Sequence, residues 1–277
     1  MNYIEVIFTL TPFEPWSDLL SSELGELGFE SFLEEDGVLK TYVTKDLFNE
    51  VKVKECHTLN NDLVQVSYSY QELEQQNWNK EWESNFSPVY VEKEICVRAT
   101  FHDPEPSFPY EIIIDPKMSF GTGHHSTTHL MLNSMCEIDF KDKSVLDMGS
   151  GTGVLAIFAA MKGAKPVFAI DIDEWCSVNA MENAIANGVE FIQISQGDKK
   201  DIEGLKVDIL IANINRNILI HQMDAYAKAI NPGGELHISG FYLEDVTMLV
   251  EEATKNGLEF AKKNSMNNWT TLKFNKL

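Results

Sequence analysis

Ten consecutive residues near the middle of the chain, FGTGHHSTTH from Phe120 to His129, concentrate side chains that could do chemistry. His125 and His129 lie four residues apart, which places both rings on one face of a helix and would suit a metal site. However, no glutamate accompanies them as in an HExxH zinc site, and the sequence shows no third ligand. We therefore expect no metal here and interpret the segment as a loop around another ligand.

The residues after this loop, LMLNSM, have helical periodicity. We expect a hydroxyl residue, Ser126, Thr127 or Thr128, to cap the N-terminus of that helix. Gly121 and Gly123 would let the loop fold over its ligand.

A glycine-rich turn, DMGSGTG, ends an apolar strand and begins at Asp147. Glycines at such a place allow the backbone to turn tightly and to approach a ligand at the N-terminus of the next helix. Gly149, Gly151 and Gly153 do not follow the GxGxxG order of dinucleotide enzymes, because Val154 stands where the last glycine would be. The turn predicts a bound ligand but disfavours a nicotinamide cofactor.

Two further strand ends carry polar residues, Asp171 in AIDID and Asn213 in ANIN. A carboxylate at the end of the second strand can accept hydrogen bonds from both hydroxyls of a ribose, and ligands bind where the carboxyl ends of parallel strands meet. Gly149, Asp171 and Asn213 thus converge on an adenosine-bearing ligand. The alternative, a turn without a ligand and Asp171 as a helix cap, does not explain why three strand ends agree.

A parallel sheet is needed to bring these residues together, and the pattern of the chain predicts one. After strands within 89–101 and 110–115, apolar strands are expected over 143–148, 166–173, 191–198, 207–214 and 230–241, with helices over 154–164, 174–188, 218–230 and 245–257. This alternation is typical of a doubly wound α/β sheet covered on both faces. The last strand, NWTTLKFNK, alternates with polar residues, so we expect it to be an antiparallel edge strand.

The first 70 residues predict a separate, smaller domain. The expected elements are strand 3–10, helix 15–28, strands 30–36 and 38–44 joined by a hairpin turn, helix 45–59 and strand 62–70. This βαββαβ order is that of a ferredoxin-like α+β domain. Because the segment contains no cluster of catalytic residue types, we interpret residues 1–70 as a recognition domain.

Residues 71–88, QELEQQNWNKEWESNFSP, are expected to form a linker helix, and residues 89–277 a catalytic domain. Trp78, Trp82 and Phe86 would form an aromatic stripe on the linker. We interpret this stripe as a packing seam between domains rather than as a ligand site.

The chain of 277 residues carries a formal net charge of −21. Residues 1–88 hold 17 acidic and 5 basic side chains, a net charge of −12, and residues 89–277 hold 26 and 17, a net charge of −9. Such a surface repels a phosphate backbone and attracts basic partners, so we expect a cationic protein substrate and no direct binding of nucleic acid. The alternative is that the acidity serves solubility alone.

We expect neither a membrane nor a secreted location. No apolar run approaches the ~20 residues of a membrane span, and the start, MNYIEVIFTL, lacks the basic region of a signal peptide. The four cysteines, Cys56, Cys96, Cys136 and Cys176, form no CxxC pair, as expected for reduced thiols of a cytoplasmic protein.

The glycine turn, the acidic end of the next strand and the segment NPGGELHISG together resemble class I S-adenosylmethionine-dependent methyltransferases, which have a Rossmann-like sheet. Within that class, DPKMSFGTGHHSTTHLML, VLDMGSGTGVLAI, AIDID, NAMENAIANGV and DILIANI resemble the PrmA family over nearly the whole chain. The motifs FGTGxHxTT and ANI are specific to that family, whereas the glycine turn alone is not. The resemblance implies methylation of amino groups, lysine side chains or the N-terminal amine, of large-subunit ribosomal protein L-eleven (L11).

The resemblance also implies that Thr128, Gly149, Asp171 and Asn213 contact S-adenosylmethionine, with Thr128 turned toward its methionine end. It implies that the N-terminal domain holds the ribosomal protein while the linker lets it swing, and we expect a monomer. The sequence departs from the common family pattern at a few positions of these motifs, among them Ser126, where proline is common.

Methyl transfer from a sulfonium to an amine is an in-line displacement, for which a protein mainly supplies alignment and a dry site. The amine must be neutral: at pH 7 an N-terminal amine of pKa ~8 is roughly a tenth neutral, whereas a lysine of pKa ~10.4 is neutral in about one part in 2,500. We expect the carbonyls of the ANIN turn and the Asn213 amide to hold the amine, and Phe120 to wall the reacting centre. No catalytic base is assigned, although His124 is a candidate.

Other interpretations of the sequence are a methyltransferase of another protein or of a small-molecule amine, a nicotinamide-dependent oxidoreductase, a non-enzymatic adaptor and a nucleic-acid methyltransferase. The glycine spacing disfavours the oxidoreductase, the intact cofactor residues disfavour the adaptor, and the net charge disfavours nucleic acid. No feature of the sequence selects which amines are modified or how many methyl groups each receives.

Overall fold

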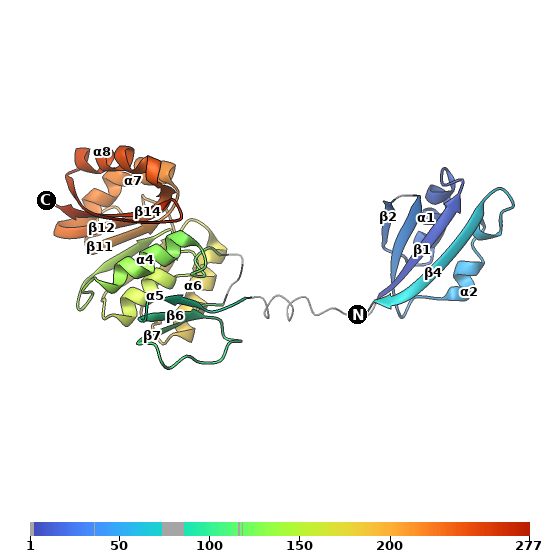
Figure 1. Ribbon diagram of the computed structural model, residues 1–277, viewed down its shortest axis with the longest axis horizontal. Helices are drawn as coiled ribbons and strands as arrows, with labels where there is room; N and C mark the ends of the chain where they lie inside the picture. The colour runs from blue at the N-terminus through green and yellow to red at the C-terminus, as the bar shows by residue number, and fades with distance from the viewer. Residues whose placement is uncertain (1–2, 36, 74–85, 116, 118) are drawn as a thin grey trace. The chain divides into compact units, whose positions relative to one another are not determined.

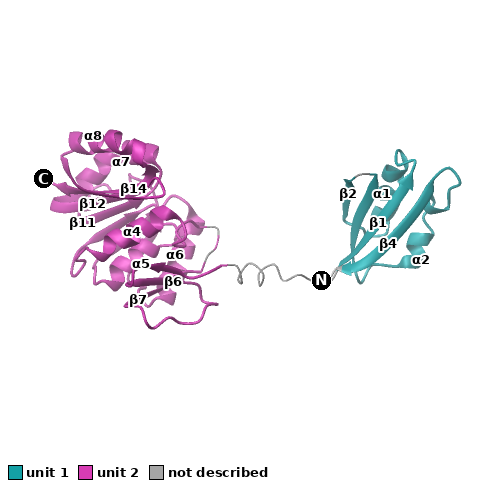
Figure 2. Cartoon of the chain, viewed as in Figure 1, with its two compact units in different colours: residues 1–85 teal, residues 86–277 magenta. Residues whose placement is uncertain are grey.

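The fold, given by a computed structural model, is described for residues 3–35, 37–73, 86–115, 117 and 119–277 (Figure 1). The chain divides into two compact units, residues 1–85 and residues 86–277 (Figure 2). One hydrophobic cluster forms the core of the first unit, and two others lie in the second.

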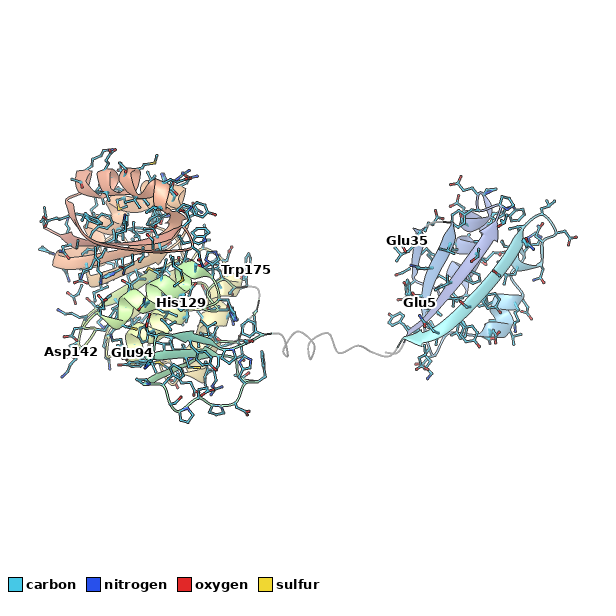
Figure 3. The ribbon with its side chains drawn as sticks, in the orientation of Figure 1. Glu5, Glu35, Glu94, His129, Asp142 and Trp175 are labelled. Atoms are coloured by element: carbon cyan, nitrogen blue, oxygen red, sulfur yellow. The ribbon has the colours of Figure 1, made fainter. Side chains whose placement is uncertain are left out.

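The first unit contains β1 (Tyr3–Thr11), α1 (Trp16–Glu26), β2 (Ser31–Glu35), β3 (Val38–Thr44), α2 (Glu50–Lys54), the 3₁₀ turn η1 (Thr58–Asn60) and β4 (Gln65–Leu73). Its sheet has the order β2-β3-β1-β4, with every pairing antiparallel. Alternate residues of β1, such as Val6 and Phe8, share a core with Leu20 of α1, whereas Glu5 belongs to the other face of the sheet (Figure 3). The element order is the βαββαβ order that the sequence predicts.

The second helix of this unit is shorter than expected. A helix was expected over residues 45–59, but α2 spans only five residues. Asn49 interrupts the predicted segment, because its side chain accepts hydrogen bonds from the amides of Val51 and Lys52 and so caps the helix there.

The segment between the units begins later than expected. β4 continues to Leu73, so the expected domain boundary at residue 70 falls inside a strand. Residues 86–88 are irregular. Residues 74–85, which include Trp78 and Trp82, lie outside the described residues, so the linker helix and its aromatic stripe stay predictions.

The second unit contains two sheets. The small sheet is formed by β5 (Val89–Val91), β6 (Ile95–Arg98) and β7 (Tyr110–Ile113). The large sheet contains β8 (Val145–Met148), β9 (Val167–Asp171), β10 (Gln193–Gln196), β11 (Val207–Asn213), β12 (Ile230–Tyr242), β13 (Leu258–Met266) and β14 (Trp269–Lys276). The helices are α4 (Ser126–Cys136), α5 (Val154–Met161), α6 (Glu174–Ala186), α7 (Arg216–Ala229) and α8 (Val246–Lys255), with the 3₁₀ turn η2 (Leu243–Asp245). In the part of the chain that is described, no helix is long and apolar enough to cross a membrane.

The large sheet has the order β10-β9-β8-β11-β12-β14-β13. The first five strands of this order pair in parallel, and β14 is antiparallel to both of its neighbours. The strand order reverses between β8 and β11, and a crevice forms outside the carboxyl ends of the strands at such a point. The doubly wound α/β fold predicted from the sequence is confirmed.

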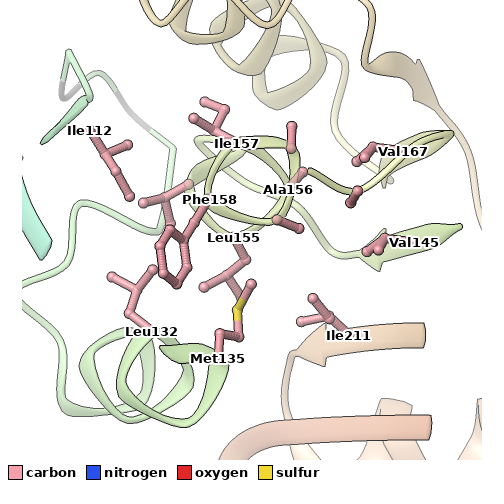
Figure 4. Packing of buried hydrophobic residues seen from close by; sticks show 14 of the residues in the cluster. Ile112, Leu132, Met135, Val145, Leu155, Ala156, Ile157, Phe158, Val167 and Ile211 are labelled. Carbon is pink, nitrogen blue, oxygen red and sulfur yellow. The ribbon is translucent and has the colours of Figure 1, made fainter. Parts of the chain in front are cut away.

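The apolar strands of this sheet are covered on both faces, as continuous apolar runs require. On one face, Val145 and Ile211 share a core with Leu155 of α5 and with residues of α4 (Figure 4). On the other face, the neighbouring residues Leu146 and Leu210 pack with α7 and α8. Two cores on opposite faces fix the register of β8 against β11, and with it the position of their polar ends.

The antiparallel edge of the sheet is not the strand that was expected. β14 lies between β12 and β13, and β13 is the edge strand. β13 could not be predicted from the sequence, because LEFAKKNSM lacks the apolar alternation that marks a strand, and in the structure only Leu258 of this strand is buried. Its exposed residues Lys262 and Lys263 suit an edge, since charged side chains discourage pairing with other chains.

Candidate active site

A pocket of about 370 Å³, called the large pocket below, lies at the carboxyl ends of β8, β9, β10 and β11. Three of the four residues expected to contact the cofactor, Gly149, Asp171 and Asn213, line it. Trp175 of α6 lines it as well (Figure 3). The sheet therefore brings together the three strand ends that the sequence singles out.

The glycine turn requires glycine because other segments approach it closely. Gly149 has φ +76°, and a Cβ built on it would lie 2.2 Å from Cγ2 of Ile214. Gly151 has φ +53°, and its Cβ would lie 2.1 Å from the carbonyl oxygen of Phe120. The turn is thus held between the residue after β11 and the loop before α4.

Asp171 ends β9 and is almost fully buried. Its Oδ2 accepts a hydrogen bond from the Gly151 amide (2.8 Å), and its Oδ1 accepts one from the Asp173 amide (3.1 Å). These bonds fix the carboxylate at the wall of the large pocket, and each oxygen keeps a second lone pair for a ligand. The arrangement suits the predicted contact with ribose hydroxyls.

Asn213 ends β11 and holds its amide in a defined orientation. Its Nδ2 donates to Oγ1 of Thr128 (3.4 Å). Its Oδ1 is buried and has no hydrogen-bond partner among the described residues. A ligand in the pocket that carries an N–H or O–H group could donate to this oxygen and satisfy it.

Thr128, the fourth expected contact, lies in the first turn of α4 and is completely buried. It lines neither this pocket nor the smaller one beside it. The structure places it behind Asn213, where its hydroxyl orients the amide.

A smaller pocket of about 270 Å³, called the small pocket, adjoins the large one. The two share a wall formed by Phe120, Asn213, Ile214 and Asn215. The rest of the small pocket is lined by His125, Thr127, Gly240 and Trp269. The Trp269 ring lies 4.8 Å from the His125 ring and 4.1 Å from the Tyr242 ring between centroids, so this pocket has aromatic walls.

A histidine, not a hydroxyl residue, caps α4. The Nδ1 of His125 accepts a hydrogen bond from the Thr127 amide (3.3 Å) and lies 2.8 Å from the hydroxyl of the same residue. The expectation that Ser126, Thr127 or Thr128 caps the helix is wrong, because the helix already begins at Ser126.

The geometry gives no support to a metal site at His125 and His129. Among the described residues, the one group whose ligand atoms approach closely enough to hold a metal ion is Asp171, Asp173 and Cys176. Asp171 belongs to the large pocket, and its two oxygens are already oriented by backbone amides.

His124, the candidate base, lines neither pocket. Its Nε2 lies 2.9 Å from the carbonyl oxygen of Ser87, and its Nδ1 lies 3.1 Å from Oγ1 of Thr122. With both ring nitrogens engaged outside the pockets, His124 is not placed to take a proton from a reactant.

Asp147 is completely buried beneath the glycine turn. Its Oδ2 accepts a hydrogen bond from the Ala156 amide (3.1 Å), and its Oδ1 has no partner among the described residues. Burial raises the pKa of this carboxyl to about 7. Asp147 lies outside both pockets and supports the turn rather than a ligand.

Several residues of the site were not identified from the sequence, and Asp198 and Trp269 are two of them. Asp198 lines the large pocket directly after Gly197 at the end of β10, and the rule that selected Asp171 could have found it. Trp269 lines the small pocket because it opens β14, and the position of that strand in the sheet was not predicted.

The large pocket fits a molecule with a ribose and an apolar ring. Asp171 and Asp198 supply carboxylates, and Ile172, Ile214 and Ile218 supply apolar side chains. Ile172 lies exposed at the rim of this pocket, where a bound ring would cover it. The donor and acceptor set therefore agrees with an adenosine-bearing cofactor.

Comparison with protein families gives a match over most of the chain. The model of the family described as ribosomal protein L11 methyltransferase (PrmA) matches residues 21–277. A ribosomal protein L11 methyltransferase of Bacteroides thetaiotaomicron is 45% identical over 278 residues, which cover 99% of each chain. One from Porphyromonas gingivalis is 44% identical over 285 residues, which cover 99% of this chain and 98% of the relative.

Solved structures agree with these matches. A ribosomal protein L11 methylase from Lactobacillus delbrueckii subsp. bulgaricus superimposes with a TM-score of 0.65 at 27% identity, covering 69% of this chain and 100% of that one. A 16S rRNA methyltransferase of T. thermophilus, solved with AdoMet and guanosine, superimposes with a TM-score of 0.50 at 20% identity over 57% of this chain and 45% of that one. The second likeness shows the shared fold alone.

Proposed function

The chain belongs to the ribosomal protein L11 methyltransferase (PrmA) family, and we propose that it transfers methyl groups from S-adenosylmethionine in the large pocket to an amine of ribosomal protein L11 in the small pocket. One observation supports the assignment of the cofactor to the large pocket and of the amine to the small one. Oδ1 of Asn213, at the wall that the two pockets share, is a buried acceptor without a partner among the described residues.

S-adenosylmethionine supplies a methyl group on a sulfonium, which is already reactive toward a neutral amine. Asp171 would hold the ribose hydroxyls, and Ile172 with Ile218 would contact the adenine. Gly149 leaves room for Ile214, so that both residues can line the pocket beside the cofactor. The protein's task is therefore to bind and orient the cofactor rather than to activate it.

The amine would be held at Asn213. An N–H of the amine donates to Oδ1, and the Thr128 hydroxyl keeps that oxygen in place through Nδ2. One such bond restricts the rotation of the amine, so its lone pair can be directed toward the large pocket. Orientation of this kind is what an in-line displacement needs from a protein.

The small pocket would also favour the neutral form of the amine. Its aromatic side chains, Phe120 and Trp269, would cover a bound amine, and removal from water disfavours an ammonium group. A cationic cofactor in the large pocket would disfavour it further, because like charges repel. The proton can leave to solvent before the amine enters, so the reaction does not require a dedicated base.

The acidic first unit would bind the ribosomal protein. Residues 1–85 carry 12 of the 21 net negative charges, and a basic protein is attracted to such a surface. We propose that the enzyme works as a monomer in the cytoplasm, where ribosomal proteins are made, and does not bind nucleic acid itself.

The test is methylation of purified L11 with labelled S-adenosylmethionine by the full-length enzyme and two variants. Asn213→Ala should lower kcat about 10- to 100-fold at saturating cofactor, as expected for the loss of a buried hydrogen bond in the reacting complex. Asn217→Ala is the matched control, because Asn217 is exposed on α7 and lines neither pocket. Equal kcat for all three proteins would contradict the assignment of Asn213, and no labelling of L11 by the wild type would contradict the function.

A further inference from the structure

The loop of residues 120–125 supplies Phe120 to both pockets and His125 to the small one, and it is fixed at its first end by the glycine turn. The Thr152 amide donates to the carbonyl of Phe120 (2.9 Å), and the Thr152 hydroxyl donates to the carbonyl of Gly121 (2.7 Å). Both glycines of the loop, Gly121 and Gly123, have positive φ angles. A segment with two glycines in six residues has much conformational freedom to lose, so it needs further contacts to hold one conformation.

The second end of the loop is fixed by His124. Its Nε2 meets the carbonyl oxygen of Ser87 (2.9 Å), and its ring lies 4.5 Å from the Phe86 ring between centroids. Beside it, Gly123 lies against Val89, at ordinary contact distance from where a Cβ would be. Residues 86–89, where the chain enters the second unit, are thus the support on which the loop rests.

These contacts engage both nitrogens of the ring. A carbonyl oxygen can only accept, so Nε2 of His124 donates its hydrogen to Ser87. Nδ1 shares a hydrogen bond with the hydroxyl of Thr122, which can donate or accept and belongs to the same loop. The ring joins the loop to the supporting segment through one bond on each side.

The residues on either side of His124 explain why this anchor matters. Phe120 lines both pockets, and His125, the next residue, lines the small pocket and contacts Trp269. Loss of the anchor would let Phe120 and His125 move without altering any residue that touches a reactant.

We propose that His124 is a positioning residue for methyl transfer, which holds the loop of residues 120–125 in the conformation that completes both pockets by binding it to Ser87 and Phe86. This role rests on the proposed function of the two pockets. It predicts that removing the ring lowers the fraction of enzyme whose loop is ready to bind, which weakens binding of cofactor and substrate together.

The test uses the full-length enzyme and three variants. His124→Ala removes both hydrogen bonds, and His124→Gln restores a donor that can reach the carbonyl of Ser87, because the amide nitrogen of glutamine occupies a place similar to Nε2. His221→Ala is the control, because His221 is an exposed histidine on α7 whose ring also makes one hydrogen bond, to Lys199 (3.1 Å). Hydrogen exchange of the loop amides, cofactor affinity by calorimetry, and kcat and KM over a range of pH are measured for each protein.

For His124→Ala we expect faster exchange of the loop amides, a cofactor dissociation constant and a KM for L11 each raised about 3- to 10-fold, and an unchanged shape of the pH profile. His124→Gln should recover most of the loss, and His221→Ala should match the wild type. Unchanged exchange and affinity in His124→Ala would overturn the proposal. So would a loss of activity above about 100-fold with disappearance of the acid limb of the pH profile, since that is the behaviour of a general base.

Hydrogen exchange and calorimetry require no turnover. If the wild type binds cofactor but does not methylate L11, the proposed function fails while these two measurements still decide the role of His124.

Discussion

At the scale of single residues, the site separates two kinds of environment. The carboxylates of Asp171 and Asp198 line the large pocket, whereas the small pocket is lined mainly by aromatic side chains. The two meet at Asn213, whose amide is held from behind by Thr128. Substitutions in the large pocket should therefore change the dissociation constant of the cofactor, whereas substitutions in the small pocket should change the kinetic constants for L11. The roles of individual residues can thus be measured separately.

Asp171→Ala should weaken S-adenosylmethionine binding about 10- to 100-fold, because hydrogen bonds to a charged acceptor contribute roughly 1.5–3 kcal/mol. Isothermal titration calorimetry measures the dissociation constant directly. The control is Asp224→Ala, which removes an exposed carboxylate of α7 outside both pockets. An unchanged dissociation constant for Asp171→Ala would remove this residue from the cofactor site.

Asp147 should make the stability of the protein depend on pH. Its folded-state pKa of about 7 lies above the ordinary value of 3.8, so between these values the folded state binds more protons than the unfolded state. The free energy of unfolding therefore falls as pH rises from about 4 to about 7, and then levels off. Asp147→Asn keeps an acceptor for the Ala156 amide and lacks the charge, so its stability relative to wild type should increase over that interval.

Denaturant unfolding of wild type and Asp147→Asn at several pH values measures this difference. At about 1.4 kcal/mol per pKa unit the full effect is on the order of 4 kcal/mol. A difference that does not change between pH 4 and pH 8 would show that the carboxyl of Asp147 has an ordinary pKa in the fold.

Gly149, Asp171 and Asn213 could be predicted from the sequence because a general rule places the ends of parallel strands at one ligand-binding edge. The capping histidine could not be predicted, since serine is a preferred N-cap and histidine is not, so the residue types favour Ser126. Trp269 could not be predicted as a site residue either, because its position depends on the pairing of β14 with β12 in the large sheet.

At the scale of elements, the glycine turn and the loop of residues 120–125 form one structure. The loop lies on the turn through Thr152, and Gly151 leaves room for the carbonyl of Phe120. The sequence shows both as glycine-containing segments, which begin at Phe120 and at Asp147, but it does not show that they touch. Periodicity describes each element alone, whereas this contact arises from the packing of α4 and α5 on the same face of the sheet.

Gly151→Ala should separate these two elements. A Cβ at this position would overlap the carbonyl oxygen of Phe120 at 2.1 Å, in addition to the strain of φ +53°. We expect loss of cofactor binding and a lower melting temperature. Gly204→Ala is the matched control: it also has a positive φ (+82°) but no heavy atom within 4 Å, so it reports the backbone strain alone, ~1–2 kcal/mol.

Thermal unfolding and calorimetry compare the two alanine variants. Equal effects on stability and full cofactor binding by both would show that the close approach of Phe120 to the turn is not required.

At the scale of the whole molecule, charge and chemistry are divided between the two units. The first unit is the more acidic, none of its described residues lines either pocket, and every proposed contact with the reactants lies after residue 119. The sequence predicted this division from composition. It placed the boundary at residue 70 because the strand pattern fades there, although β4 continues to Leu73.

Deleting residues 1–85 should leave the cofactor dissociation constant near that of the full chain and strongly reduce methylation of L11. For the full-length enzyme, kcat/KM should fall as the salt concentration rises from 0.01 M to 0.1 M, because the screening length falls from ~30 Å to ~10 Å. Turnover of both proteins at matched cofactor saturation provides the comparison. Equal turnover would show that recognition of L11 lies in residues 86–277.

The proposed reaction of this chain is methylation of amines of ribosomal protein L11, and mass spectrometry detects its product. Ribosomal proteins and ribosomal RNA from cells that lack the enzyme are incubated with the purified full-length protein and labelled S-adenosylmethionine. We predict that the label appears on amines of L11 and on no ribosomal RNA, and that Asn213→Ala removes most of it. Label on another ribosomal protein or on RNA, with L11 unmodified, would contradict the account.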